Sequence, residues 1–146
     1  MSINSIKWNY KKMIDITKYF SKGLKTSIQI KDNGSFSHNG PWKQVYTNTQ
    51  VARWHSGEFS SAEFTISIDY STTQKEIIKC IVCNSADYAS LTVIGRSNLG
   101  TNLVELSVTA NSSYVDLLIN PADAAYNGAK FIHTAQYFRN QNPLTP

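Results

Sequence analysis

The sequence predicts an all-β protein, an antiparallel β-sandwich (jelly-roll-like), preceded by a basic N-terminal arm. The composition favours strands over helices, because aromatic residues make up 12% of the chain and charged residues only 16%, with many Ser, Thr and Asn residues. From residue 43 onward, short segments of alternating apolar and polar side chains follow one another. Their connectors are rich in turn formers and contain no helical crossover of the kind a parallel sheet needs.

Residues 1–31 are expected to form the arm, and residues 32–146 the sandwich domain. The arm holds seven lysines against Asp15 alone, a net charge of +6, whereas the remainder holds seven basic and nine acidic residues, a net charge of −2. Its apolar spacing favours an extended start and a short helix over about 12–22 that ends at Gly23. The residues expected to dock on a neighbouring protein are Lys7, Trp8, Tyr10, Lys11, Lys12 and Phe20.

A hairpin is expected next. Residues 24–30 alternate, and Asp32, Asn33 and Gly34 follow; an Asn-Gly pair after such alternation is a strong hairpin signal, because both residues tolerate positive φ. The "HNGP" stretch at 38–41 predicts a second turn, which would contain His38.

The body of the domain reads as consecutive strands. The segments are 43–54, 62–70, 75–83, 89–95, 103–110, 114–120 and 129–138. Side chains of one parity are expected in the core. The clearest of these inward-facing sets are Phe64, Ile66, Ile68 and Tyr70, then Val104, Leu106 and Val108, then Val115, Leu117 and Ile119.

Two cysteines stand in a C-x-x-C spacing at Cys80 and Cys83, which zinc and thiol redox sites also use. On a strand, residues an odd number apart point to opposite faces, so these two sulfurs do not converge on one ion or one bond. A zinc site would also need two further ligands, and no second motif supplies them. We interpret both as small buried thiols and expect no metal and no cofactor.

The histidines do not suggest an enzyme. His55 falls near a strand end and His133 alternates with Phe131 and Ala135 along the last strand; no nucleophile elbow, phosphate loop or paired-carboxylate motif accompanies them. We therefore expect no catalytic residues. The arm lacks arginine, the usual reader of phosphates, so nucleic acid is not expected as a partner, and no apolar run is long enough for a membrane span.

Aromatic side chains near predicted loops allow a second interpretation. Flat rings at strand ends stack on sugars in carbohydrate-binding sandwiches, although such rings also simply fill the ends of a core. The candidate glycan-facing residues are Trp42, Trp54, Tyr88 and Tyr126.

Three stretches carry a family resemblance: "GEFSSAEFTISIDY" (57–70), "LTVIGRSNLGTNLVELSV" (91–108) and "GAKFIHTAQYFRNQNPL" (128–144). In these stretches the chain resembles a β-rich domain of structural proteins from T4-like tailed phages of marine bacteria, the cyanophage type. The resemblance implies a virion component, made in the host cytoplasm, and supplies no catalytic residues.

We therefore expect a structural virion protein, a head decoration, neck, tail or baseplate subunit, that contacts other virion proteins and forms a homo-oligomer. The alternative is a carbohydrate-binding module used in host attachment.

Overall fold

The computed structural model describes residues 29–31 and 34–141. The predicted helix over 12–22 and the six predicted docking residues of the arm lie outside the described residues; these are Lys7, Trp8, Tyr10, Lys11, Lys12 and Phe20. The expected hairpin is present, because residues 29–31 pair antiparallel with residues 36–38. This hairpin spans the expected boundary between arm and domain at residue 31.

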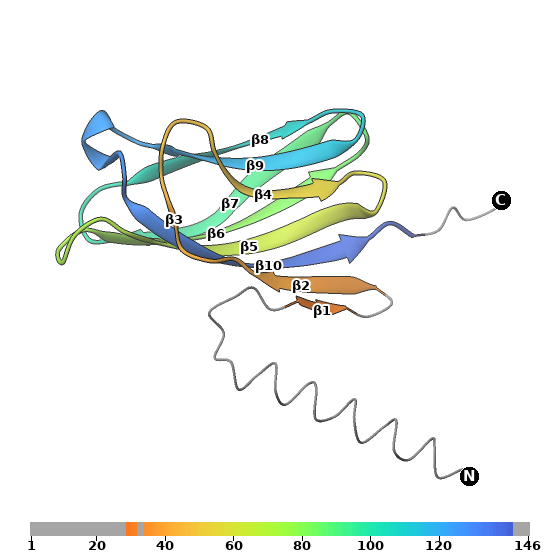
Figure 1. The fold of residues 1–146 in the computed structure, drawn as a ribbon, viewed down its shortest axis with the longest axis horizontal. Coiled ribbons are helices and arrows are strands. Elements are labelled where there is room, and N and C mark those ends of the chain that lie inside the picture. Colours follow the sequence, from red (N-terminus) through yellow and green to blue (C-terminus); the bar gives the residue numbers. More distant parts are fainter. Residues whose placement is uncertain (1–28, 32–33, 142–146) are drawn as a thin grey trace, which may run out of the picture.

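Two antiparallel sheets face each other (Figure 1). In spatial order the large sheet contains β1 (Gln29–Lys31), β2 (Ser35–Asn39), β10 (Lys130–Arg139), β5 (Phe59–Asp69), β6 (Lys75–Asn84) and β7 (Ala89–Asn98). The short strand β3 (Lys43–Gln44) also belongs to this sheet and pairs with the start of β10. The small sheet contains β4 (Thr49–His55), β9 (Tyr114–Pro121) and β8 (Val104–Ala110). The chain changes sheet after β3, β4, β7 and β9, and the two sheets form the predicted antiparallel β-sandwich.

The core lies between the sheets and follows the predicted alternation. Strand β5 buries Phe64, Ile66 and Ile68, and β9 buries Val115, Leu117 and Ile119 from the other side. Strand β6 adds Ile78, Cys80 and Val82, and the last strand adds Phe131. Each large apolar side chain buried in this way contributes about 1.5–3 kcal/mol.

Local predictions fail in three places. The segment 43–54 is two strands, because a turn at Val45–Asn48 interrupts it; Asn48 has a φ of 54° and Thr49 N–H donates to Tyr46 O at 3.2 Å. His38 lies in β2, paired with Ala135, because pairing with β10 extends the strand through residue 39. Tyr70 follows the end of β5 and is 41% exposed.

The cysteines point to opposite sides of β6, as predicted. Cys80 is buried, and burial raises the pKa of its thiol to about 12. Cys83 is exposed, so the interpretation of both as buried thiols is wrong for Cys83: the outer face of this sheet is not covered at that point. Both thiols are free.

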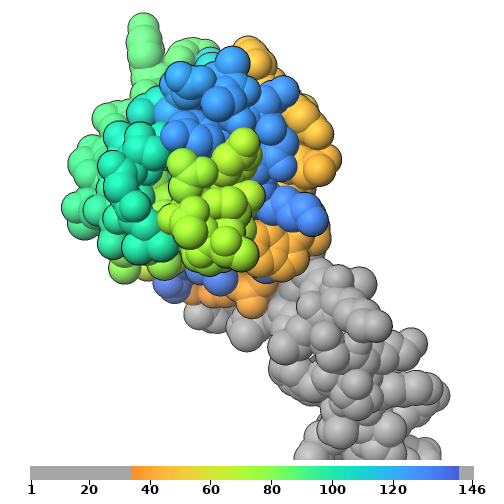
Figure 2. All heavy atoms as spheres, turned by 90° about the vertical axis from the view of Figure 1, so that its left-hand side faces the viewer, coloured from red at the N-terminus to blue at the C-terminus, as the bar shows by residue number. Residues whose placement is uncertain are grey.

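The turn after β5 and the β9–β10 connection lie side by side at one end of the sandwich, as the lime and blue segments in Figure 2 show. The Tyr70 hydroxyl donates to Ala125 O at 2.8 Å, and the Tyr70 and Tyr126 rings meet edge to face at 5.2 Å. Ala125 and Tyr126 belong to a short 3₁₀ helix, η1 (Ala124–Tyr126), whose first turn is capped by Asp123. No helix within the described residues is long and apolar enough to cross a membrane.

One flank of the sandwich, where β6 and β7 meet the start of β8, is closed by a buried charge network. Glu76 is 3% exposed and faces the interior. Its carboxylate accepts from Arg96 Nη1 at 3.2 Å, from Asn98 Nδ2 at 3.1 Å and from the Leu103 backbone N–H at 3.3 Å. Arg96 Nη1 also donates to Val104 O at 2.8 Å, so the network joins the two sheets. The buried Glu76 carboxylate is therefore both ion-paired and hydrogen-bonded, which offsets the cost of removing a charge from water.

Candidate functional site

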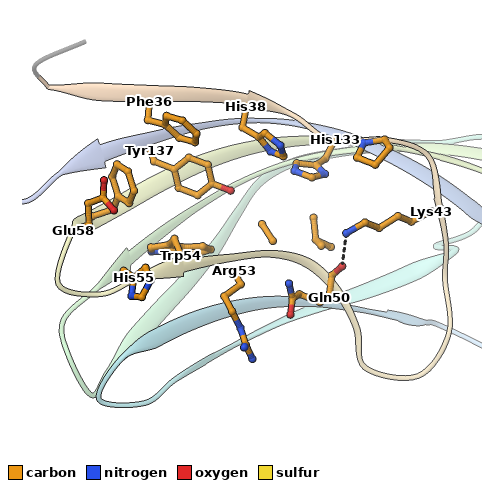
Figure 3. Close-up of a pocket in the computed structure, with 14 residues that line it drawn as sticks. Phe36, His38, Lys43, Gln50, Arg53, Trp54, His55, Glu58, His133 and Tyr137 are labelled. Atoms are coloured by element: carbon orange, nitrogen blue, oxygen red, sulfur yellow. Dashed lines mark hydrogen bonds between the residues drawn. The ribbon is translucent and has the colours of Figure 1, made fainter. Parts of the chain in front are cut away.

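A cavity opens on the opposite flank, between β2, β10 and β4 (Figure 3). Its volume is about 390 Å³, within the range of small-molecule pockets. It exists because the large sheet continues through β10 to β2 and β1, whereas β4 is the edge of the small sheet. The inner face of β2 is therefore only partly covered, and its side chains are half-buried.

Strand register determines which side chains line the cavity. On β10, His133 and Tyr137 share the inward parity with Phe131 and Ala135. Because Phe36 pairs with Tyr137 and His38 pairs with Ala135, the two β2 rings point to the same side. Trp54 comes from β4, where an irregularity between Gln50 and Ala52 shifts the register.

Aromatic rings form a continuous wall. Phe36 lies 5.8 Å from Tyr137 and 5.9 Å from Phe59, measured between ring centroids. Tyr137 lies 5.5 Å from Trp54. The His38 ring is stacked parallel to Phe36 at 6.4 Å and lies 5.8 Å from His133. These separations are typical of packed rings, and the rings line the cavity together with polar and charged side chains.

His133 is the unusual member of this wall. It is 2% exposed, and both ring nitrogens are buried without a hydrogen-bond partner among the described residues. Burial, with the nearby His38 and Lys43, lowers its pKa to about 4. The imidazole is therefore neutral at pH 7, with one nitrogen that donates and one that accepts. A buried polar group left without partners calls for an explanation such as a ligand or an ordered water.

Gly40 holds the His133 ring in place. A Cβ at Gly40 would lie 2.2 Å from His133 Cε1, so any larger residue would displace the imidazole. The Gly40 backbone N–H also donates to His133 O at 2.9 Å. Because Gly40 of the "HNGP" sequence has no side chain, its backbone packs closely against the His133 ring.

Two other polar groups face the cavity. The Tyr137 hydroxyl points into it in Figure 3, and burial raises the pKa of this group, which is therefore a neutral donor and acceptor at pH 7. Burial and Lys43 lower the pKa of His38.

The charged side chains around the cavity differ in their partners. Arg53 forms a two-point ion pair with Asp116, at 2.7 and 3.0 Å. Glu58 accepts from Arg139 at 2.9 Å. Lys43 forms no ion pair among the described residues; its ammonium group donates only to Gln50 O, at 3.4 Å. The mouth therefore has one cation whose charge no carboxylate in the described part of the chain offsets.

The predicted glycan-facing aromatics do not form one site. Trp42 lies just before β3 and is 52% exposed. Tyr88 lies in the β6–β7 turn and is 80% exposed. Tyr126, in η1, is packed on Tyr70 at the end of the sandwich opposite the β6–β7 turn (Figure 1). Trp54 is 4% exposed, donates from Nε1 to Asn84 Oδ1 at 2.9 Å, and lines the cavity.

Sequence reasoning missed His38, His133 and Tyr137 as neighbours in one cavity. The inward parity of His133 was visible in the sequence. His38 lies beside His133 because of the register between β2 and β10, and the sequence around residue 38 does not indicate that register. Among the described residues, no group of three or more His, Cys, Asp or Glu side chains is arranged to hold a metal ion.

The chain is similar in part to two phage tailspike proteins of known structure. One is the tailspike protein gp49 from Acinetobacter baumannii bacteriophage Fri1, a capsular polysaccharide depolymerase, with a TM-score of 0.49 and 14% identity over 84% of this chain and 21% of that one. The other is the tailspike protein of Acinetobacter phage vB_ApiP_P1, with a TM-score of 0.43 and 13% identity over 66% of this chain and 22% of that one. This chain thus matches about a fifth of each tailspike chain. No protein-family model and no curated protein matches the sequence.

Proposed function

We propose that the protein is a non-catalytic structural component of a tailed-phage virion, a head decoration, neck, tail or baseplate subunit, that acts through contacts with other virion proteins and with copies of itself. The resemblance of residues 57–144 to phage structural domains supports the class of protein. The observation that carries the proposal is the concentration of exposed apolar side chains on β6, β7 and their turns.

Six of the ten exposed large hydrophobic side chains in the described residues belong to this region. We call them the assembly surface: Ile77, Ile81, Tyr88, Val93, Ile94 and Leu99. Their exposed fractions range from 41% to 80%. Ile77 and Ile81 lie on the outer face of β6, Val93 pairs with the inward-facing Cys80, and Tyr88 and Leu99 flank the two ends of β7, so the side chains follow the β7 edge of the sheet. A run of exposed apolar side chains along one edge suits an interaction site.

Strand β7 gives the assembly surface a second property. It is the edge of the large sheet, and no further strand among the described residues pairs with it. Soluble proteins protect such edges with lysine, proline, inward-pointing charges or bulges; "ASLTVIGRSN" contains no lysine or proline, but it has the inward-pointing Arg96 and one bulge. A bulge opposite Lys79 and Cys80 leaves Ile94 unpaired and 56% exposed. The exposed Ile94 and the absence of lysine and proline suit an edge that another subunit covers.

The substitution Ile94→Lys tests the assembly role. We expect it to weaken self-association at least tenfold, because it places a charge in a contact that excludes water. Light scattering after gel filtration measures the effect, and Tyr46→Lys is the control, since Tyr46 is comparably exposed (46%) but lies away from β6 and β7.

Mass spectrometry of purified particles of the phage that encodes the chain gives the second measurement. The proposal requires the chain to be present at a fixed copy number in every preparation. A protein that stays monomeric at high concentration and is absent from particles would overturn it.

A carbohydrate-binding module used in host attachment is the second candidate function. The aromatic wall of the cavity, with the unpartnered His133 nitrogens beside it, favours this candidate. Sugars bind proteins by stacking apolar ring faces on aromatic side chains and by hydrogen bonds from their hydroxyl groups.

A further inference from the structure

We propose that the cavity between β2, β4 and β10 binds a sugar ring that carries a carboxylate, with His133 and Tyr137 bonding its hydroxyl groups and Lys43 its carboxylate. This inference rests on the second candidate function and names its site and its class of ligand. It does not depend on the assembly role.

The first step concerns His133. Its two nitrogens are the described buried side-chain polar atoms without a hydrogen-bond partner, and they belong to a residue that lines an open cavity. A neutral imidazole that donates from one nitrogen and accepts at the other matches a sugar hydroxyl, which can also do both. Bonding this ring removes the cost of about 1–3 kcal/mol attached to an unsatisfied buried polar group.

The second step concerns the walls. The Tyr137 hydroxyl gives a further donor and acceptor on the same side of the cavity as His133 (Figure 3). Phe36, Phe59 and Trp54 surround these polar groups with aromatic surface. An aliphatic ligand would leave the imidazole unbonded, whereas a pyranose has both an apolar face and a ring of hydroxyl groups.

The third step concerns charge. Arg53 and Glu58 already have partners, Asp116 and Arg139, so they add little net charge at the cavity. Lys43 reaches the cavity without an ion-pair partner among the described residues. An unpaired ammonium group at the mouth of the cavity favours an anionic ligand, which here selects a uronic-acid type of sugar over its neutral counterpart.

The experiment compares matched pairs of saccharides on the full-length chain: methyl glucuronide against methyl glucoside, and methyl galacturonide against methyl galactoside. Binding is followed by NMR, through the His133 ring proton Hε1, at millimolar concentrations. We expect the acidic sugars to shift this resonance and to bind about tenfold more tightly than the neutral ones, the factor typical of a hydrogen bond to a charged group.

Two variants assign the roles. Lys43→Gln should remove the tenfold preference for the acidic sugar and leave the neutral sugar unaffected, and Lys79→Gln, on the outer face of β6, is the matched control. Tyr137→Phe keeps the ring and should weaken both sugars about fivefold. A near-ultraviolet circular dichroism spectrum verifies that each variant folds.

The outcomes separate the two proposals. Equal binding of acidic and neutral sugars, with the His133 resonance shifted, would retain the carbohydrate-binding function and overturn the inferred selectivity. Binding that shifts the Trp42 indole instead of His133 would overturn the assignment of the site. No response to any of the four saccharides would overturn both the site and the carbohydrate-binding function, and an ordered water would then account for His133.

Discussion

The two flanks of the sandwich each bury an ionisable side chain on the inner face of the large sheet, and they treat it differently. On the closed flank, Glu76 has charged, amide and backbone partners. On the open flank, neither ring nitrogen of His133 has a hydrogen-bond partner among the described residues, and its pKa is lowered so that it stays neutral. The difference teaches that a completed network holds a structure together, whereas an incomplete one beside a cavity marks a candidate binding site.

The largest expected effect lies on the closed flank. Glu76→Ala removes the buried partner of Arg96 and leaves its guanidinium only the exposed Glu105, at 3.8 Å, so we expect a loss of about 3 kcal/mol in the free energy of unfolding. Urea denaturation measures it. Asp69→Ala breaks the exposed ion pair with Lys75 and should cost less than about 1 kcal/mol. Similar losses in the two variants would contradict the structural importance of the Glu76 network.

The second prediction concerns pH on the open flank. Folding lowers the pKa of His133 from 6.5 to about 4. The main cause is burial of the ring, and the second is repulsion from the two basic side chains that face it, His38 from β2 and Lys43 from β3. Between these values the unfolded chain binds the proton more strongly. The stability that His133 contributes is therefore complete above pH 6.5 and is lost as the pH falls toward 4, by about 3 kcal/mol in total.

Denaturation midpoints measured from pH 7.5 to pH 4 test this slope. In His133→Leu the contribution of His133 should vanish, and the slope left over belongs to His38 and the carboxylates. An unchanged slope in the variant would mean that folding does not shift the pKa of His133.

The third prediction sharpens the packing of the same residue. Gly40→Ala forces the His133 ring to move, because the added Cβ would lie 2.2 Å from Cε1, and overpacking of this kind costs about 1–3 kcal/mol. Gly57→Ala is the control, since an added Cβ there meets nothing within 4 Å. Thermal unfolding of both variants measures the difference. Equal melting temperatures would show that the ring moves freely.

The smallest expected effect is electrostatic. Lys43 lowers the pKa of both His38 and His133, so Lys43→Gln should raise both pKa values. NMR titration of the ring protons records the shifts. Lys79→Gln, on the outer face of β6, should leave them unchanged; if it shifts them equally, Lys43 has no special position at the cavity.

Much of the fold could be predicted because alternation is a local property. The inward sides of β5 and β9 follow from their sequences, and Phe64, Ile66, Val115, Leu117 and Ile119 are buried as expected. The errors arose where a neighbour in space changed the outcome. Pairing with β10 turned the "HN" of the predicted turn into strand, and the missing cover over β6 left Cys83 exposed.

The candidate site was less predictable. Trp54 was singled out as a glycan-facing ring, and it does line the cavity, although as a buried side chain bonded to Asn84. Trp42, Tyr88 and Tyr126 lie elsewhere. Proximity to loops selects residues near strand ends, but it does not distinguish one end or one flank of the sandwich from another.

The sequence by itself determined the class of fold, the faces that turn inward, and the divergence of Cys80 and Cys83, because each depends on the direction of successive side chains along one strand. Only the tertiary structure decided that His38 and His133 share a cavity while Glu76 lies in a closed network. The physical reason is that the neighbours of a strand are chosen by register and sheet order, which bring together residues far apart in the chain.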